Sequence, residues 1–172
     1  VIHGDVSFDA VHFDRLPDLS QCIVKGGFDV GLCELTSLVG SPKEVTGALI
    51  CQHNNLKDLV GAPKIVGGSV YCWISGLTSL NGSPEYVGGN FIIDNNRLKT
   101  LAGSPKVVGK VFQCSGNLLR SLKGISPKIG GEIKYIGNPV YGNESPEDLK
   151  LLRSLAKGAP AEDLVDRLIQ YQ

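Results

Sequence analysis

The cysteines and histidines are the residues of this chain best suited to metal binding or nucleophilic catalysis, and Cys51 and His53 are the closest such pair. A zinc or catalytic-cysteine site needs several of these groups within reach of one another. No C-x-x-C pair occurs, His3 and His12 lie far along the chain from His53, and no glycine-lysine phosphate loop is present. We therefore expect no catalytic residue, no metal and no cofactor, and we do not expect an enzyme.

The charge balance of the chain argues against partners, such as nucleic acid, that bind proteins of high net charge. Lys plus Arg and Asp plus Glu both number 17, so the formal net charge is zero. Proteins that bind nucleic acid usually carry a basic excess, because affinity comes from neutralising phosphates. No apolar run is long enough to span a bilayer, and residues 1–20 do not resemble a signal peptide. The odd number of cysteines favours reduced thiols and a cytoplasmic location.

Proline turns recur along the chain at a fixed period. Pro42, Pro63, Pro84 and Pro105 are 21 residues apart, and Pro127 follows after 22. Pairs of leucines repeat with the same step: Leu35/Leu38, Leu56/Leu59, Leu77/Leu80, Leu98/Leu101 and Leu119/Leu122. Coincident signals at one period of this length indicate a repeat protein whose units stack on one another.

A strand-like segment of alternating apolar residues lies between the glycines and leucines of each repeat. Seven copies begin at positions 6, 28, 49, 70, 91, 112 and 133. Successive side chains of a strand point to opposite faces, so Leu49 and Cys51 are expected inside and Ile50 outside. One repeat cannot bury its inner side alone, but stacked copies can. The period therefore predicts a ladder of parallel strands.

An asparagine follows the strand segment in four of the copies. The position holds a small residue, cysteine or serine, in two others: the column reads Cys33, Asn54, Ser75, Asn96, Asn117 and Asn138. We expect a tight corner here, where an inward amide bonds backbone groups of neighbouring coils that would otherwise lack partners.

The pattern L-x-C-x-x-N-x-L-x-x-L from Leu49 to Leu59 resembles the leucine-rich-repeat consensus. The short period and the proline turn in place of a helix are similar to the repeats of secreted bacterial effectors and of bacteriophage and bacterial proteins. The resemblance covers about residues 5–141 and departs at 16–19, where Leu-Pro-Asp-Leu replaces the usual turn. It implies a β-rich, right-handed parallel solenoid of about seven coils that binds proteins.

The repeat divides the chain into two parts. Residues 1–141 are expected to form the solenoid, with the first coil as its N-terminal cap, and residues 142–172 two short helices. Ser145 is a good N-cap residue and Gly158 a helix stop, and a second helix is expected from about Ala161 to Tyr171. These helices either cap the last coil or dock on a partner or a second copy.

The outward positions of the central strands define a candidate binding site for a partner. Ile50, Tyr71, Trp73 and Ile92 cluster there, and Asp94 and Gln113 adjoin them. An exposed apolar group with Trp and Tyr is typical of binding hot spots. The alternative is that a loop or the C-terminal helices cover these residues, or that they are scattered surface side chains.

Three functions follow from these observations. The leading hypothesis is a non-enzymatic protein-binding module, of phage or bacterial origin, which engages a host or viral protein in the bacterial cytoplasm. A second is a structural, self-assembling component that uses residues 143–172 or the solenoid ends. A third is nucleic-acid association through a lysine edge, formed by Lys43, Lys64, Lys106 and Lys128 and interrupted by Glu85. The lysines equally suit a solvated edge that resists aggregation.

Overall fold

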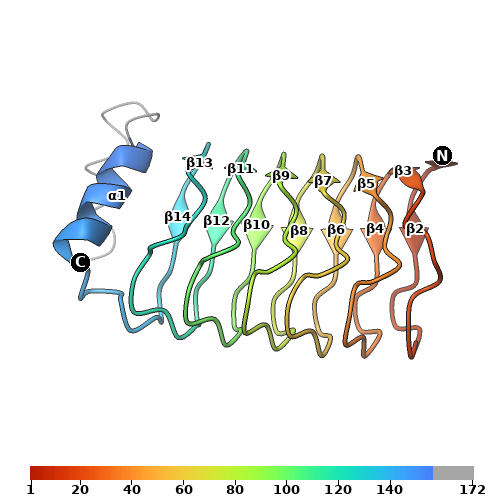
Figure 1. Ribbon diagram of the computed structural model, residues 1–172, viewed down its shortest axis with the longest axis horizontal. Helices are drawn as coiled ribbons and strands as arrows, with labels where there is room; N and C mark the ends of the chain where they lie inside the picture. Colours follow the sequence, from red (N-terminus) through yellow and green to blue (C-terminus); the bar gives the residue numbers. More distant parts are fainter. Residues whose placement is uncertain (157–172) are drawn as a thin grey trace.

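The computed structural model describes residues 1–156 and shows a parallel β-solenoid that ends in a short helix (Figure 1). Each coil contributes one strand to each of two seven-stranded sheets, over about six turns. We call the two sheets the odd and even sheets after their strand numbers. The fold class expected from the repeat, a β-rich solenoid with a helical cap, is confirmed.

The strands are short because the chain bends at a corner on either side of them. The odd sheet contains β1 (Ile2–His3), β3 (Ile23–Lys25), β5 (Glu44–Val45), β7 (Ile65–Val66), β9 (Tyr86–Val87), β11 (Val107–Val108) and β13 (Lys128–Ile129). The even sheet contains β2 (Val6–Ser7), β4 (Phe28–Asp29), β6 (Leu49–Ile50), β8 (Val70–Tyr71), β10 (Phe91–Ile92), β12 (Phe112–Gln113) and β14 (Ile133–Lys134). The helix α1 spans Pro146–Ala156.

The register of the even sheet confirms the seven copies read from the sequence. Each strand start pairs with the next copy's start, as Leu49 pairs with Val70 and Val70 with Phe91. The ladder continues past the strand ends, since the N–H of Cys51 donates to the carbonyl of Tyr71 at 2.8 Å. The alternation is also as expected, because Leu49 and Cys51 are fully buried.

The core is a set of apolar columns that run along the stack. It is filled by the inward residues of both sheets and by the paired leucines, for example Leu77 and Leu80. Phe91 and Phe112 stack on each other with ring centroids 5.4 Å apart. Full burial of such a side chain contributes about 1.5–3 kcal/mol, so each coil depends on its neighbours for stability.

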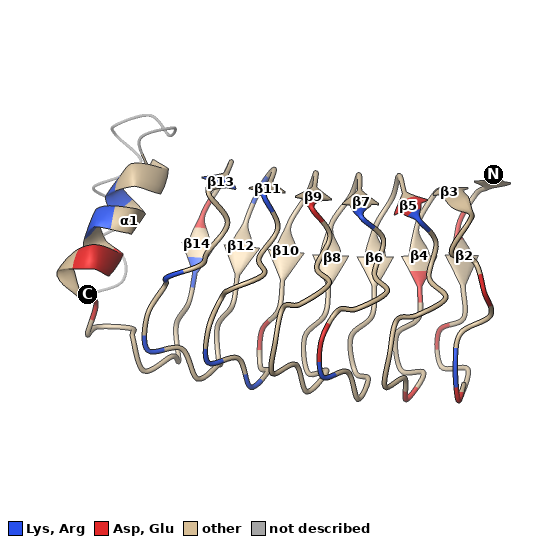
Figure 2. Cartoon of the chain, in the orientation of Figure 1, with Lys and Arg blue, Asp and Glu red and all other residues tan. Residues whose placement is uncertain are grey.

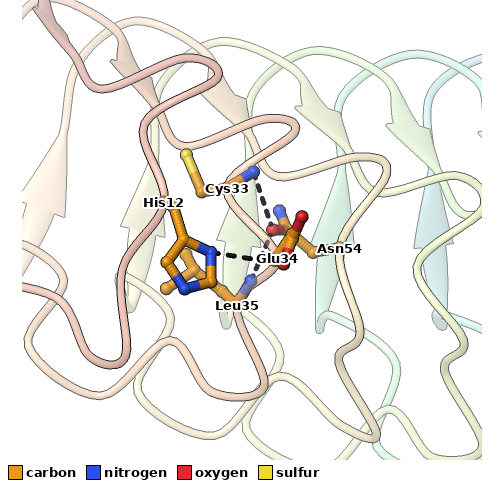
Figure 3. A network of polar contacts seen from close by, with 5 residues as sticks. All are labelled: His12, Cys33, Glu34, Leu35 and Asn54. Atoms are coloured by element: carbon orange, nitrogen blue, oxygen red, sulfur yellow. Dashed lines mark hydrogen bonds and ion pairs between the residues drawn. The ribbon is translucent and has the colours of Figure 1, made fainter.

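Buried asparagines join adjacent coils at one corner (Figure 3). The Oδ1 atom of Asn54 accepts hydrogen bonds from the N–H groups of Cys33 and Leu35, at 3.2 and 2.9 Å. Its Nδ2 atom donates to the carbonyl oxygens of Val30 and Cys51. The role expected of this column is confirmed, because one amide satisfies backbone groups of two coils.

The second sheet was not expected from the sequence, which predicted only one strand in each repeat. The odd strands lie between the proline turn and the glycines, where only two residues alternate before the chain bends. The glycines at this bend allow the coils to approach closely. A Cβ atom on Gly88 or Gly109 would lie 2.2 or 2.1 Å from the carbonyl oxygen of the glycine one coil earlier.

Two positions differ from the expectation. In the first copy, which begins at position 6, Val11 occupies the position of the inward corner column, but its side chain is 45% exposed, because no earlier coil packs against it. Lys128 was aligned with Lys106, but it pairs in register with Val107. The 22-residue step before Pro127 shifts the chain by one position, so Pro127 takes the place of the next lysine and is exposed.

The helix α1 closes the C-terminal end of the stack. Ser145 caps it as expected, since its Oγ accepts from the N–H of Asp148 at 3.1 Å. The Asp148 carboxylate, 2% exposed, accepts from the N–H of Leu122 at 2.7 Å and from the hydroxyl of Ser121 at 2.9 Å. In an inner coil, the N–H of the equivalent residue Leu59 donates to the carbonyl of Asn81 in the next coil. At the last coil the Asp148 carboxylate therefore takes the place of that carbonyl as the acceptor for Leu122. The second expected helix lies outside the described residues.

Candidate functional site

The expected binding residues lie side by side on the outer surface of the even sheet. Ile50, Tyr71 and Ile92 occupy the same position of the adjacent strands β6, β8 and β10, and all three are partly exposed. Trp73 lies two residues after Tyr71 and is also partly exposed. Within residues 1–156, α1 packs at the far end of the stack and does not cover this group (Figure 1). We call Ile50, Tyr71, Trp73 and Ile92 the front patch.

The two aromatic residues of the front patch hold each other in place. Their rings pack edge to face, with centroids 5.6 Å apart. The indole Nε1–H of Trp73 donates to Nε2 of His53 at 3.3 Å, which places His53 on the same surface. Ordered aromatic side chains lose little conformational entropy when they bind, so this arrangement suits a preorganised contact.

Asp94 and Gln113 lie beside the front patch and are bonded to each other. The amide Nε2 of Gln113 donates to Oδ2 of Asp94, and the N–H of Ser115 donates to its Oδ1 at 2.7 Å. Burial raises the pKa of Asp94, although both hydrogen bonds oppose the shift. These residues form a fixed polar border on one side of the apolar group.

Two further apolar side chains extend this surface, and sequence reasoning missed both. Leu32 and Ile74 are 53% and 48% exposed. Both have left-handed backbone conformations, with φ of 55° and 50°. Equivalent positions in other coils hold Ala10, His53 and Asn95, with φ between 53° and 58°, and Gly116 and Gly137. Asparagine and glycine are the residue types that best tolerate positive φ. Those asparagines and glycines were the sequence signal that the position is left-handed.

The left-handed conformation carries a cost at these two residues. A bulky or β-branched residue with positive φ is strained by about 1–3 kcal/mol. Neither side chain recovers that cost by full burial, because about half of each remains exposed. Glycine or asparagine would satisfy the fold better, so the stability of the solenoid does not explain Leu32 or Ile74.

The cysteines are distributed as the repeat predicts. Cys51, Cys72 and Cys114 are buried in the core and Cys33 is buried at the corner, while His53 is exposed. All five cysteines are free. Burial raises the pKa of the Cys33 and Cys114 thiols, and contact with Cys72 together with burial raises that of Cys51. These thiols stay protonated near neutral pH, whereas a nucleophilic or ligating cysteine needs the thiolate. Among residues 1–156, no group of three or more His, Cys, Asp or Glu side chains is arranged to hold a metal ion.

The lysine edge is weaker than the sequence suggested. Lys106 forms an ion pair with Glu85 at 2.5 Å. Lys128 lies in the next column, as described above, so the row that backbone hydrogen bonds join from coil to coil consists of Lys43, Lys64, Glu85 and Lys106.

Compared with known proteins, the chain matches no family model, no curated protein and no solved structure. In the described part of the chain, α1 has 11 residues, and no helix has the length and apolar character needed to cross a bilayer.

Proposed function

We propose that the chain is a non-enzymatic protein-binding module of the leucine-rich-repeat type, and that it engages another protein through the front patch. The supporting observation is the coincidence of two features on one surface. Tyr71 and Trp73 form an ordered aromatic pair, and Ile74, which directly follows Trp73, is exposed at a cost to the fold, as is Leu32 two coils earlier in the same column. Strain that does not serve stability is typical of functional surfaces.

The proposal assigns a role to each part of the surface. The aromatic pair and Ile74 form the apolar centre of the contact, and Asp94 and Gln113 form a polar border. Large aromatic residues at the centre of a contact contribute most of the binding free energy in protein interfaces. The resemblance to short bacterial and bacteriophage repeats favours a bacterial or viral protein as the partner, encountered in the bacterial cytoplasm.

Affinity capture from the source cells tests the proposal. We compare the wild-type chain with the double variant Tyr71→Ala/Trp73→Ala and with Leu118→Ala as a matched control. Leu118 is 46% exposed on a coil outside the front patch. We expect the double variant to lose a protein that wild type and control retain, with thermal unfolding nearly unchanged. Equal capture by all three chains, or loss of folding in the double variant, would contradict the proposal.

A further inference from the structure

The odd sheet has an apolar stripe of its own. Ile65, Tyr86 and Val107 are paired in register on β7, β9 and β11 and point outward. Ile65 and Tyr86 are each 44% exposed, which is unusual for two large apolar neighbours. We call these three residues the odd-sheet stripe.

Lysines border the odd-sheet stripe. Lys64 directly precedes Ile65 and is exposed, and Lys43 is its equivalent one coil earlier. Lys128 continues the column of Val107 at the C-terminal end of the stripe. Glu44 and Glu85 are the acidic residues of the same strands and turns, and Glu85 is neutralised by Lys106. More lysines than carboxylates therefore border the apolar stripe, although Glu44 pairs in register with Ile65 and basic and acidic segments are interspersed along the odd strands (Figure 2).

The surface of the even sheet has the opposite charge next to its own apolar group. Asp5, Asp9 and Asp29 lie on its first two coils, and Asp29 pairs in register with Ile50 of the front patch. Lys134 lies at the other end of the same column. Two of these carboxylates are held by backbone N–H groups: Asp5 by Gly27 at 2.6 Å and Asp29 by Gly31 at 2.9 Å.

Asp9 and Asp29 also converge. An Oδ1 atom of each lies 3.3 Å from the point that a Cβ atom on Gly31 would occupy. The amide Nε2 of Gln52 lies at the same distance from this point. The two carboxylates together attract a cation from a partner.

From these two surfaces we propose that the chain self-associates, with the odd-sheet stripe of one copy against the even-sheet surface of another. Apolar side chains meet in the centre, and Lys43 and Lys64 approach Asp9 and Asp29 of the second copy. The inference deepens the proposed function, on which it rests, because it names a second copy as one partner of the front patch.

The repeat spacing favours a second copy over an unrelated partner. Neighbouring strands are about 4.8 Å apart in any such ladder. Two copies share this spacing, so contacts made by one coil recur at the next coil without loss of register. Complementary charges then select the pairing of odd with even surfaces and oppose the pairing of like surfaces.

Sedimentation velocity over a range of protein concentrations, at low and high salt, tests the inference. We expect wild type to associate as its concentration rises, and salt to weaken the association. Lys43→Glu/Lys64→Glu and Asp9→Lys/Asp29→Lys should each raise the dissociation constant at least about tenfold. An equimolar mixture of the two variants should associate again, because the two reversed surfaces are complementary to each other and so are the two unchanged surfaces.

Two controls separate the charge effect from other causes. Lys57→Glu/Lys99→Glu makes the same charge change at exposed lysines outside both surfaces and should associate like wild type. Asp29→Lys also removes the hydrogen bond to the N–H of Gly31, so the double variant Asp9→Lys/Asp29→Lys can be less stable than wild type. If thermal unfolding shows this, the single variant Asp9→Lys is used in its place. A monomeric wild type at every concentration, or a mixture that stays monomeric, overturns the inference.

A second measurement separates this inference from the proposed function. Ile65→Ser/Tyr86→Ser removes the odd-sheet stripe and leaves the front patch unchanged. We expect this variant to lose self-association and still capture a foreign protein in the assay above. If the wild-type chain never self-associates but captures a foreign protein in a way that depends on Trp73, the inference is refuted and the proposed function is not. Absence of both would refute the two proposals together.

Discussion

The asparagine corner column and the left-handed column lie one residue apart, so each coil contributes to both, as Ile74 and Ser75 do. The side chains of the corner column point inward, are buried and bond the backbone of two coils. Those of the left-handed column are exposed, and their identities vary from Gly137 to Ile74. In the same turn of the chain, the residue at the corner position is needed for the stability of the fold, whereas the identity of the residue before it is not.

The largest expected effect of breaking the corner column is at Asn96. Its Oδ1 accepts from the N–H groups of Ser75 and Leu77, each at 3.0 Å, and its Nδ2 donates to carbonyls of two coils. Asn96→Ala leaves these buried groups without partners and should lower the free energy of unfolding by about 3 kcal/mol. Urea denaturation measures the change, with the exposed Asn55→Ala as control. A loss no larger than that of the control would show that the column does not stabilise the stack.

At the last coil, Asp148 replaces a backbone acceptor, and its effect depends on pH. Burial favours its neutral form, but the N–H of Leu122 and the hydroxyls of Ser145 and Ser121 outweigh burial and lower its pKa. Its stabilisation is therefore complete above about pH 4, the ordinary value for a carboxyl group, and is lost as pH falls through the lower folded pKa.

Asp148→Asn should remove this pH dependence and cost about 1–2 kcal/mol at neutral pH. Chemical denaturation at several pH values measures both effects. The exposed neighbour Glu147 provides the control as Glu147→Gln. If the variant keeps the acid sensitivity of wild type, another group is responsible for it.

Ser75 offers a way to strengthen the corner column. Its hydroxyl donates to the carbonyls of Cys51 and Trp73, at 3.0 and 3.2 Å. An asparagine there would add an acceptor for the N–H of Leu56 in the preceding coil, as Asn96 and Asn117 do for Leu77 and Leu98. We expect Ser75→Asn to stabilise the chain by about 1 kcal/mol, measured as a higher urea midpoint. A lower midpoint would show that this corner is too small for the amide.

The smallest expected effect on stability is at the left-handed column. Loss of the native side chain there should stabilise the chain, whereas loss of an asparagine of the corner column should destabilise it. Ile74→Asn relieves the strain at φ 50° and should raise the free energy of unfolding by about 0.5–1 kcal/mol. The same variant should weaken capture of the partner. A clear loss of stability would show instead that Ile74 serves the fold.

The amino-acid pattern predicted the even sheet and the corner column in detail, because the alternation of the sheet is repeated seven times and the small or amide residue of the corner six times. It missed the odd sheet, because an odd strand such as Glu44–Val45 offers one buried residue, whereas the inward alternation of the even sheet continues past the strand from Leu49 to Cys51. It placed Tyr71 and Trp73 outside correctly, but it did not find Leu32 or Ile74. The sequence reveals a left-handed backbone position only when the residues at the same position of other coils, such as Asn95 and Gly116, are compared.

The glycine bend described at Gly88 and Gly109 has a consequence for how such a chain can change over generations. A single-base change that adds a side chain there drives two backbones apart. Duplication of a 21-residue unit introduces no such collision, since each new glycine lies against another glycine. The length of the molecule can therefore grow or shrink by unequal crossing-over, while a point mutation of Gly88, Gly109 or Gly130 requires the facing backbones to move apart.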